Sequence, residues 1–200
     1  MSPAASAPRR GRRPGAPDTR AAILEAARGL FATQGFAGTT IRAIGTAAGV
    51  DAALVHHYFG SKDDLFVAAL DIPVDPRQVL APVVAGGVEG AGARLLEALL
   101  PVWDDPDVRP ALLTVARAAM DASSPGLVSK GFLPVVIYPL GPALGLDRPD
   151  LRMPLVASQV AGLILLRYVF EVEPLASMGR DQVVATYAPT LQRYLTAELP

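Results

Sequence analysis

The sequence predicts an all-α protein. An N-terminal three-helix helix-turn-helix domain is expected over residues 18–72, called the head, and a larger helical domain over residues 73–200, called the body. Apolar residues recur three and four positions apart through most of the chain, which is the spacing of one helix face. Glycine, proline and aspartate clusters divide the chain into helix-length segments. No alternation of useful length predicts a strand.

The first predicted helix begins with Asp18 or Thr19 as its N-cap and continues to about Gln34. Gly35 is expected to end it, because glycine adopts backbone conformations that other residues avoid. Phe36 is then expected to pack beneath the helices that follow, which makes the first helix a scaffold. Its apolar face is formed by Ile23, Leu24, Ala27, Leu30 and Phe31.

Two short helices joined by a glycine turn follow. Thr39 or Thr40 can cap the first helix, and Gly49 is placed to end it in a left-handed conformation. Asp51 can cap the second helix, which is expected over residues 52–58. Such a pair is the helix-turn-helix pattern, whose second helix enters the major groove of DNA. An ordinary helical hairpin shows the same spacing, so this pattern alone leaves both interpretations open.

The surrounding segments narrow the choice. The first helix ends in LFATQGF, the helix pair begins with TTIRAIGTAAGV, and HHYFGSKDDLF follows. Together they resemble the DNA-binding domain of the tetracycline-repressor-like (TetR) family of bacterial transcriptional regulators. Ser61 can cap a further helix from Lys62 to about Leu70, which in that family connects the head to the body. One position departs from the family pattern, because His56 stands where a tyrosine usually follows the residue equivalent to Val55.

Candidate DNA contacts lie along this pair of helices and at the start of the next. Arg42 can bind a phosphate or a guanine edge, and the resemblance places Thr40 at the DNA with it. Asp51 and the two alanines after it are expected to face base edges, where alanine offers only apolar contact. Specificity is therefore expected to rest on Arg42, DNA shape and half-site spacing. The resemblance assigns phosphate contacts to Tyr58 and Lys62. The predicted DNA-binding residues are Thr40, Arg42, Asp51, Ala52, Ala53, His56, His57, Tyr58 and Lys62.

Charge is divided unevenly along a chain whose net charge is −1. Residues 1–70 carry eight basic and five acidic residues, and the remainder carries ten basic and fourteen acidic. A basic head on an acidic body favours a polyanionic partner for the head. Residues 1–17 are expected to form a disordered basic arm, since they are rich in glycine and proline and lack the apolar core of a secretory signal. The arm is either a solvated tail or an extension that contacts phosphates or a minor groove. Its arginines are Arg9, Arg10, Arg12 and Arg13.

Six further helices are predicted in the body, between glycine, proline and aspartate clusters. Pro139 and Pro142 are expected to bend or shorten the fourth of them. The segments WDDPDVRPALL and RYVFEVEPLA, and the later APTLQRYL, resemble those of actinobacterial members of the family. The predicted helices span residues 76–85, 90–102, 106–122, 126–144, 149–172 and 181–199.

The last two of these helices are candidates for a dimer interface. The helix over residues 149–172 is apolar or small around most of its circumference, so it needs cover on more than one side. An intrachain core would explain that pattern too, but members of the resembled family typically form homodimers through their last two helices. The expected interface residues are Ala157, Ala161, Leu165, Tyr187, Leu191 and Tyr194.

The body is also where the resembled family binds small ligands. Its aromatic and methionine side chains can enclose an apolar cavity, and a few polar ones can orient a ligand. Each of these side chains would also suit a core or interface position. The candidate ligand-binding residues are Trp103, Arg117, Met120, Phe132, Tyr138, Gln159, Leu163 and Arg167.

Several other functions are disfavoured. The chain has no cysteine, which excludes disulfides and thiolate metal sites and fits a cytoplasmic location. His56 and His57 do not share a helix face, so no metal site is expected there. The acidic run that begins at Asp104 suits helix capping better than calcium. Polar residues interrupt the most apolar run, 155–170, so no membrane span is expected.

We therefore predict a ligand-responsive transcriptional regulator, in the simplest form a repressor that binds a palindromic operator in double-stranded DNA as a homodimer, released by a small-molecule effector and without a cofactor. One competing hypothesis is an enzyme, for which the sequence offers no glycine-rich phosphate loop and no nucleophile elbow. The other is a non-specific or architectural DNA-binding protein, which the two alanines of the second short helix would suit.

Overall fold

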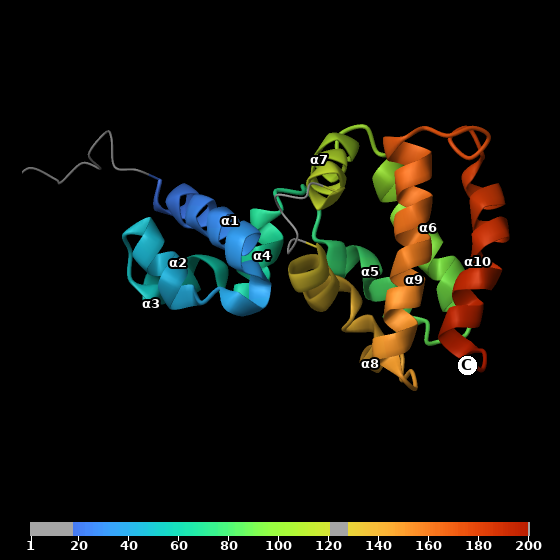
Figure 1. The fold of residues 1–200 in the computed structure, drawn as a ribbon, viewed down its shortest axis with the longest axis horizontal. Helices are drawn as coiled ribbons and strands as arrows, with labels where there is room; N and C mark the ends of the chain where they lie inside the picture. The colour runs from blue at the N-terminus through green and yellow to red at the C-terminus, as the bar shows by residue number, and fades with distance from the viewer. Residues whose placement is uncertain (1–17, 121–127, 200) are drawn as a thin grey trace, which may run out of the picture.

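The computed structural model of the protein describes residues 18–120 and 128–199. Every regular element within these two ranges is a helix, which confirms the predicted all-α class. Figure 1 shows α1–α4 together at one end of the molecule and α5–α10 as a larger group at the other. The arginines of the predicted basic arm lie outside the described residues. The elements are α1 Thr19–Gly38, α2 Ile41–Ala48, α3 Ala52–Phe59, α4 Lys62–Ala69, α5 Pro76–Ala85, α6 Ala91–Asp104, α7 Arg109–Met120, the π-helix η1 Val128–Ile137, α8 Leu140–Ala143, α9 Pro149–Ile164, the π-helix η2 Leu165–Val169 and α10 Arg180–Thr196.

Side-chain caps set where the helices of the head begin. The Asp18 carboxylate accepts a hydrogen bond from the backbone N–H of Arg20 at 3.0 Å, as predicted for the start of α1. Thr40, rather than Thr39, caps α2, since its hydroxyl oxygen accepts from the Ala43 N–H at 3.1 Å. The caps predicted for α3 and α4 are confirmed, because Asp51 accepts from Ala53 N–H and Ser61 from Asp64 N–H. Each cap satisfies a backbone donor that has no partner inside its helix.

The end of α1 differs from the prediction. Helical turns continue to Gly38, yet Gly35 has φ 71° and ψ 173°, so the helix is broken where it was expected to end. The break turns Phe36 beneath the other helices, as predicted, and its ring packs against Phe66 of α4 with centroids 5.5 Å apart. Phe31 of α1 contacts both rings. This aromatic cluster forms the centre of the head.

The body is held by close contact between α6 and α10, with α9 beside them (Figure 1). Gly92 of α6 is buried, and a Cβ added there would lie 2.7 Å from the Ala188 carbonyl oxygen of α10. The Gln192 side chain also joins the two helices, because its Oε1 accepts from the Gly92 N–H at 3.0 Å and its Nε2 donates to the Val88 carbonyl. Glycine permits this approach of the two backbones.

Two predicted body helices are not single α-helices. Within the segment predicted over residues 126–144, Val128–Ile137 form the π-helix η1, and the short α8 follows after Tyr138 and Pro139. Pro134, Pro139 and Pro142 lie in this segment, and each lacks the N–H that an α-helical ladder requires. The helix predicted over residues 149–172 is α-helical only to Ile164 and ends as η2. By contrast, α5 has the predicted bounds.

Candidate nucleic-acid interface and ligand cavity

The helix-turn-helix consists of α2, a glycine turn and α3. Gly49 ends α2 with φ 69° and ψ 30°, the left-handed conformation that glycine favours. Gly45 lies so close to the chain entering α3 that an added Cβ would be 2.9 Å from the Val50 carbonyl oxygen. Ile44 of α2 and Val55 of α3 are fully buried on the inner side. The turn therefore holds α3 closely against α2 and leaves its outer face for a partner.

Most of the predicted DNA-binding residues lie on the surface. Ala52 and Lys62 are half-buried, and Tyr58 is 43% exposed. In Figure 1 α2 and α3 occupy the end of the molecule remote from α10, so nothing in the body covers them. A surface at this place is open to a duplex. The exposed members of the predicted set are Thr40, Arg42, Asp51, Ala53, His56, His57 and Tyr58.

Lys62 has a structural role that its sequence position did not indicate. Its Nζ donates to the carbonyl oxygens of Phe36 at 2.9 Å and Thr39 at 3.0 Å, and lies 4.1 Å from the centre of the Phe36 ring. The ammonium group therefore fastens α4 to the chain between α1 and α2. A phosphate contact by Lys62 stays a prediction, and it would have to share the ammonium group with these two carbonyls.

His56 is also engaged within the head. Its Nδ1 lies 2.8 Å from the carbonyl oxygen of Gly60, at the end of α3. Because a carbonyl oxygen only accepts, Nδ1 carries the proton in this contact. The neutral ring then presents Nε2 as an acceptor, which cannot bond to a phosphate oxygen. A phosphate contact by His56 consequently requires the doubly protonated ring.

Arg20 is a further candidate that the sequence analysis did not include. It lies in the first turn of α1, is exposed, and places its guanidinium 5.2 Å from the ring centre of Phe59 at the end of α3. A cation beside the end of α3 is suited to a phosphate contact. Only the tertiary fold of the head brings it there, since the two residues are far apart in sequence.

The body contains an apolar cavity of about 370 Å³. Side chains from α5, α6, α7, η1, α8, α9 and η2 line it, together with Ile72 and Val74 from the segment between head and body. Every lining residue is apolar. Such a cavity suits a ligand whose buried part is apolar and uncharged.

The cavity contains only part of the predicted ligand-binding set. Trp103, Met120 and Phe132 line it. Leu163 is buried elsewhere in the core and Arg117 is exposed. The remaining members, Tyr138, Gln159 and Arg167, are also absent from the lining. Three residues predicted for the dimer interface, namely Ala157, Ala161 and Leu165, also line the cavity.

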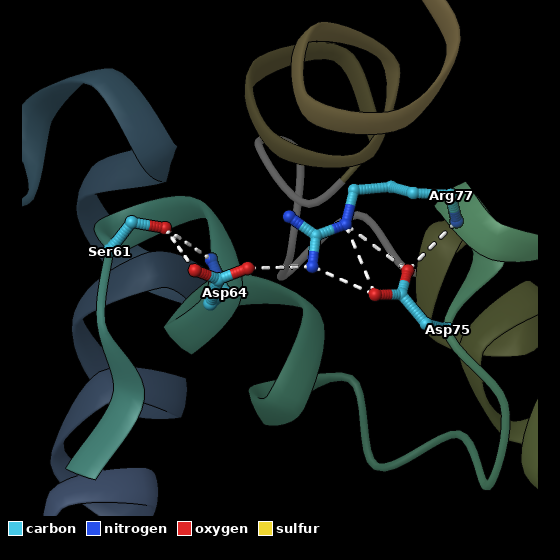
Figure 2. Close-up of polar contacts among 4 residues, drawn as sticks. All are labelled: Ser61, Asp64, Asp75 and Arg77. Carbon is cyan, nitrogen blue, oxygen red and sulfur yellow. Dashed lines mark hydrogen bonds and ion pairs between the residues drawn. The ribbon is translucent and has the colours of Figure 1, made fainter.

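An ion pair joins the head to the body (Figure 2). Arg77 of α5 donates from Nη2 to Asp64 Oδ1 of α4 at 2.7 Å and to Asp75 Oδ2 at 2.8 Å. Asp64 also accepts a hydrogen bond from the Ser61 hydroxyl at 2.6 Å. The Ser61 hydroxyl and Arg77 lower the pKa of the Asp64 carboxyl, and the Arg77 guanidinium lowers the pKa of Asp75. A second contact between head and body is made by the Lys130 side chain, which covers Gly35 of α1.

The part of the chain that the structure describes contains no group of three or more histidine, cysteine, aspartate or glutamate residues placed to hold a metal ion. Among the same residues, no helix is both long and apolar enough to cross a membrane.

Two family models match the chain. The model described as "Bacterial regulatory proteins, tetR family" matches residues 23–69. The model described as "Tetracyclin repressor-like, C-terminal domain" matches residues 89–195, which is more than half of the chain. The chain belongs to the TetR family.

The chain is similar to individual regulators and to a solved structure. The HTH-type transcriptional regulator BetI of Rhizobium meliloti is 43% identical over 54 residues, which are 27% of this chain and 27% of BetI. The HTH-type transcriptional repressor SCO4008 of Streptomyces coelicolor is 35% identical over 79 residues, which are 40% of this chain and 41% of the repressor. Well under half of each of these proteins is therefore matched. A solved structure of a TetR-family regulator, SCO0857 from Streptomyces coelicolor, is 38% identical, with 92% of this chain and 98% of that chain covered and a TM-score of 0.49.

As a member of the TetR family, the chain is a helix-turn-helix transcriptional regulator and not an enzyme. The residues predicted for a homodimer interface occupy several environments in this TetR-family body. Leu191 is 1% exposed and packs at the contact with Gly92 of α6, so its side chain is committed to the intrachain core. Tyr187 and Tyr194 on α10 are half-buried.

Proposed function

We propose that this TetR-family regulator is a ligand-responsive repressor, which binds a palindromic operator as a homodimer and leaves it when a small molecule occupies the apolar cavity. One observation carries the proposal. On α5, Pro76, Val79 and Leu80 line the cavity, while Arg77 between them is bonded to Asp64 of the head. A ligand that displaces α5 therefore acts directly on the element that holds the head.

The DNA part of the proposal rests on the outer face of the head, residues 18–72. With α3 in a major groove, Arg42 is exposed at the first turn of α2, and Tyr58 is exposed at the end of α3. Arg42 then contacts either a guanine edge or a phosphate, and Tyr58 binds the phosphate backbone. Asp51, Ala52 and Ala53 face the base edges. Specificity at those positions comes mainly from DNA shape, because alanine carries no hydrogen-bonding group.

The homodimer is proposed to form through the outer faces of α9 and α10. Exposed positions on these faces are mostly small or uncharged, among them Ser158 and Ala161 on α9 and Ala185 and Pro189 on α10. Small side chains let the helices of two copies approach closely, as in a four-helix bundle. The two α3 helices would then enter successive major grooves, about 34 Å apart.

The effector is proposed to be a predominantly apolar molecule. The cavity lining supplies no charged or polar side chain to pair with a buried ionic group, and an unpaired charge inside it would be strongly disfavoured. Burial of apolar surface contributes roughly 25 cal/mol per Å². Such a ligand shifts the regulator towards the conformations that enclose it. Operator affinity falls if the two heads of the dimer are then held at a spacing that does not match the half-sites.

Selection of DNA fragments from a random pool by the purified full-length protein tests the proposal. We expect a palindromic sequence with half-sites one helical turn apart. The affinity for it should exceed that for random DNA by about 10³-fold or more at fixed salt. Equal affinity for selected and random DNA would instead identify an architectural DNA-binding protein, which the alanines at Ala52 and Ala53 would permit.

A cavity-filling variant tests the ligand part. Ala116 lines the cavity, and Ala116→Phe is expected to reduce the binding of the apolar dye Nile red while leaving operator affinity unchanged. Ala81→Phe is the matched control, because Ala81 is exposed on α5 and does not line the cavity. Equal dye binding by the two variants would count against this cavity as the ligand site.

A further inference from the structure

A second cavity of about 280 Å³ lies beside the apolar one and has a different chemical character. It lies between the α6–α7 connection and the chain that leads from η2 to α10, and nearly all of its lining residues are polar or charged. The two cavities share one wall. Trp103, which lines the apolar cavity, stacks on Tyr168, which lines the polar one, with ring centroids 5.2 Å apart.

Arg167 is the most buried charged residue of this polar cavity, at 8% exposure. Among the described residues, its guanidinium donates one hydrogen bond, from Nη1 to the Leu175 carbonyl at 2.6 Å, and its Nε is buried without a hydrogen-bond partner. Within the same part of the chain, no carboxylate lies within 4 Å of its guanidinium. A buried guanidinium without a counter-ion is unfavourable, because it loses its hydration and gains little in return.

Arg152, on the preceding helix, shows how a buried arginine is satisfied in this fold. It is 4% exposed and pairs with the Asp147 carboxylate, with Nε 2.9 Å from Oδ1 and Nη2 3.1 Å from Oδ2. Its Nη1 donates to the carbonyl oxygens of Tyr194 and Ala197 at the end of α10. Arg152 is therefore a structural residue, whereas the charge of Arg167 is left unpaired beside a cavity.

A second guanidinium belongs to the lining of the same cavity. Arg109 also lines the cavity, and the two guanidinium carbons are 5.8 Å (Arg109) and 5.3 Å (Arg167) from the ring centre of Tyr168. The Nε of Arg109 donates to the Trp103 carbonyl at 2.9 Å. No carboxylate among the described residues lies within 4 Å of Arg109. Two cations beside one ring favour an anion between them.

Two of the three carboxylates that line the cavity have hydrogen-bond partners of their own. Asp104 accepts a hydrogen bond from the Tyr168 hydroxyl at 2.9 Å and pairs with Arg180 at 2.5 Å. Glu173 accepts a hydrogen bond from the Ser177 hydroxyl at 2.6 Å. Glu171 is exposed, so it repels an anion only at the part of the cavity nearest to it. The side formed by Arg109 and Arg167 is therefore the positive side.

We propose that the polar cavity is a second ligand site, separate from the apolar one, and that it binds the carboxylate group of a small organic acid through Arg167 and Arg109. A guanidinium presents paired N–H donors that match the two oxygens of a carboxylate. The π-helical turn η2 supplies Arg167 and Tyr168 in succession to the cavity, and such turns are frequent at functional sites. A bound acid would perturb Tyr168 and, through the ring stack, Trp103.

The test uses full-length protein titrated with benzoate, succinate or acetate, and with inorganic phosphate, at constant ionic strength. Trp103 is the single tryptophan, so its fluorescence reports on the Trp103–Tyr168 pair. We expect a saturable change with at least one carboxylate. The dissociation constant should be weakened about tenfold or more by Arg167→Met and by Arg109→Gln, and unchanged by Arg193→Gln on the exposed face of α10. No saturable change with any carboxylate, or a change with phosphate alone, would overturn the proposal.

A stability measurement separates a binding role from a structural one. Arg167→Met removes an unpaired buried charge, so the variant should have a higher Tm than the ligand-free wild-type protein. Arg152→Met breaks a satisfied ion pair and should lower the Tm. If Arg167→Met lowers the Tm as much as Arg152→Met does, Arg167 is structural and the proposal fails. If Arg167→Met does not fold, Arg167 is likewise structural and the proposal fails. Full carboxylate affinity in Arg109→Gln would also refute the site.

Discussion

Arg77 of α5 and Asp64 of α4 are joined by a hydrogen-bonded ion pair of 2.7 Å that crosses from body to head (Figure 2). Asp75 accepts from both Nε and Nη2 of the same guanidinium, which orients it towards α4. Pro76 and Val79, on either side of Arg77, line the apolar cavity. The pair is therefore a direct polar contact between α5, which lines the proposed ligand cavity, and α4 of the head.

A double-mutant cycle measures this coupling. Arg77→Ala and Asp64→Asn are each expected to lower the free energy of unfolding slightly, with a coupling of about 0.2–1 kcal/mol, because both side chains are partly exposed and screened by solvent. The cycle is read from urea denaturation at low salt and repeated at high salt, where the coupling should shrink. A coupling that is zero under both conditions would show that the contact contributes nothing to the joint of head and body.

The same contact predicts a pH dependence of stability. The pKa values of Asp64 and Asp75 are lowered from 3.8 in the folded protein, by hydrogen bonds from Ser61 and Arg77. A lowered folded-state pKa means a contribution that is present above the unfolded-state value and lost as the pH falls through the folded-state pKa. The free energy of unfolding should therefore fall as the pH drops below about 4. Arg77→Gln should reduce the slope, and an identical slope in this variant would remove Arg77 as the cause.

Lys62 and Tyr58 are expected to affect DNA binding in different ways. Lys62→Ala removes the ammonium group that donates hydrogen bonds to two backbone carbonyl oxygens. It should therefore lower the free energy of unfolding by about 1–3 kcal/mol as well as weaken operator binding. Tyr58→Phe removes an exposed hydroxyl, so it should weaken binding about three- to tenfold without changing stability.

Salt titrations of operator binding separate the two roles of Lys62. Loss of a phosphate contact reduces the slope of log affinity against log salt by about 1. If Lys62→Ala lowers stability but keeps the wild-type slope, the residue supports the fold of the head and does not bind phosphate. Thermal unfolding of each variant provides the control for folding.

His56 should make operator binding depend on pH. Its Nδ1 proton is directed to Gly60, so Nε2 donates to a phosphate only when the ring is doubly protonated. Operator affinity is therefore expected to rise as the pH is lowered, because a lower pH favours the doubly protonated ring. The dependence should disappear in His56→Tyr. A pH profile that is the same in this variant and the wild type would exclude the phosphate contact.

Short-range sequence patterns were enough to predict the helix caps and the glycine turn of the head. The caps at Asp18, Asp51 and Ser61 and the left-handed turn at Gly49 depend on residues only a few positions apart, so their physical causes lie within one stretch of sequence. The exposed face of α2 and α3 followed from the same pattern. Between Thr39 and Thr40 the sequence could not choose, because burial decided it: Thr39 is fully buried, and its hydroxyl donates to the carbonyl groups of Leu30 and Gly35.

The sequence predicted that the body is made of helices, but not which helix faces contact one another. Periodicity shows that a helix has an apolar face, and several helices then compete to cover it. Ala157 and Ala161, which were predicted for a dimer interface, also line the cavity, while Leu191 packs against α6. The conversion of Leu165–Val169 to a π-helix likewise had no local signal.

The sequence by itself determined the family, the helical class and the place of the DNA-binding element, because these depend on local spacing and on motifs. Only the tertiary structure decided the partners of the long charged side chains. Lys62 reaches carbonyl groups at Phe36 and Thr39, and Arg77 reaches Asp64. Arg167 lines a polar cavity and has no carboxylate partner within the part of the chain that the structure describes. The charged group of a long, flexible side chain binds where the folded protein provides an acceptor. The position of that acceptor depends on how helices distant in sequence pack together.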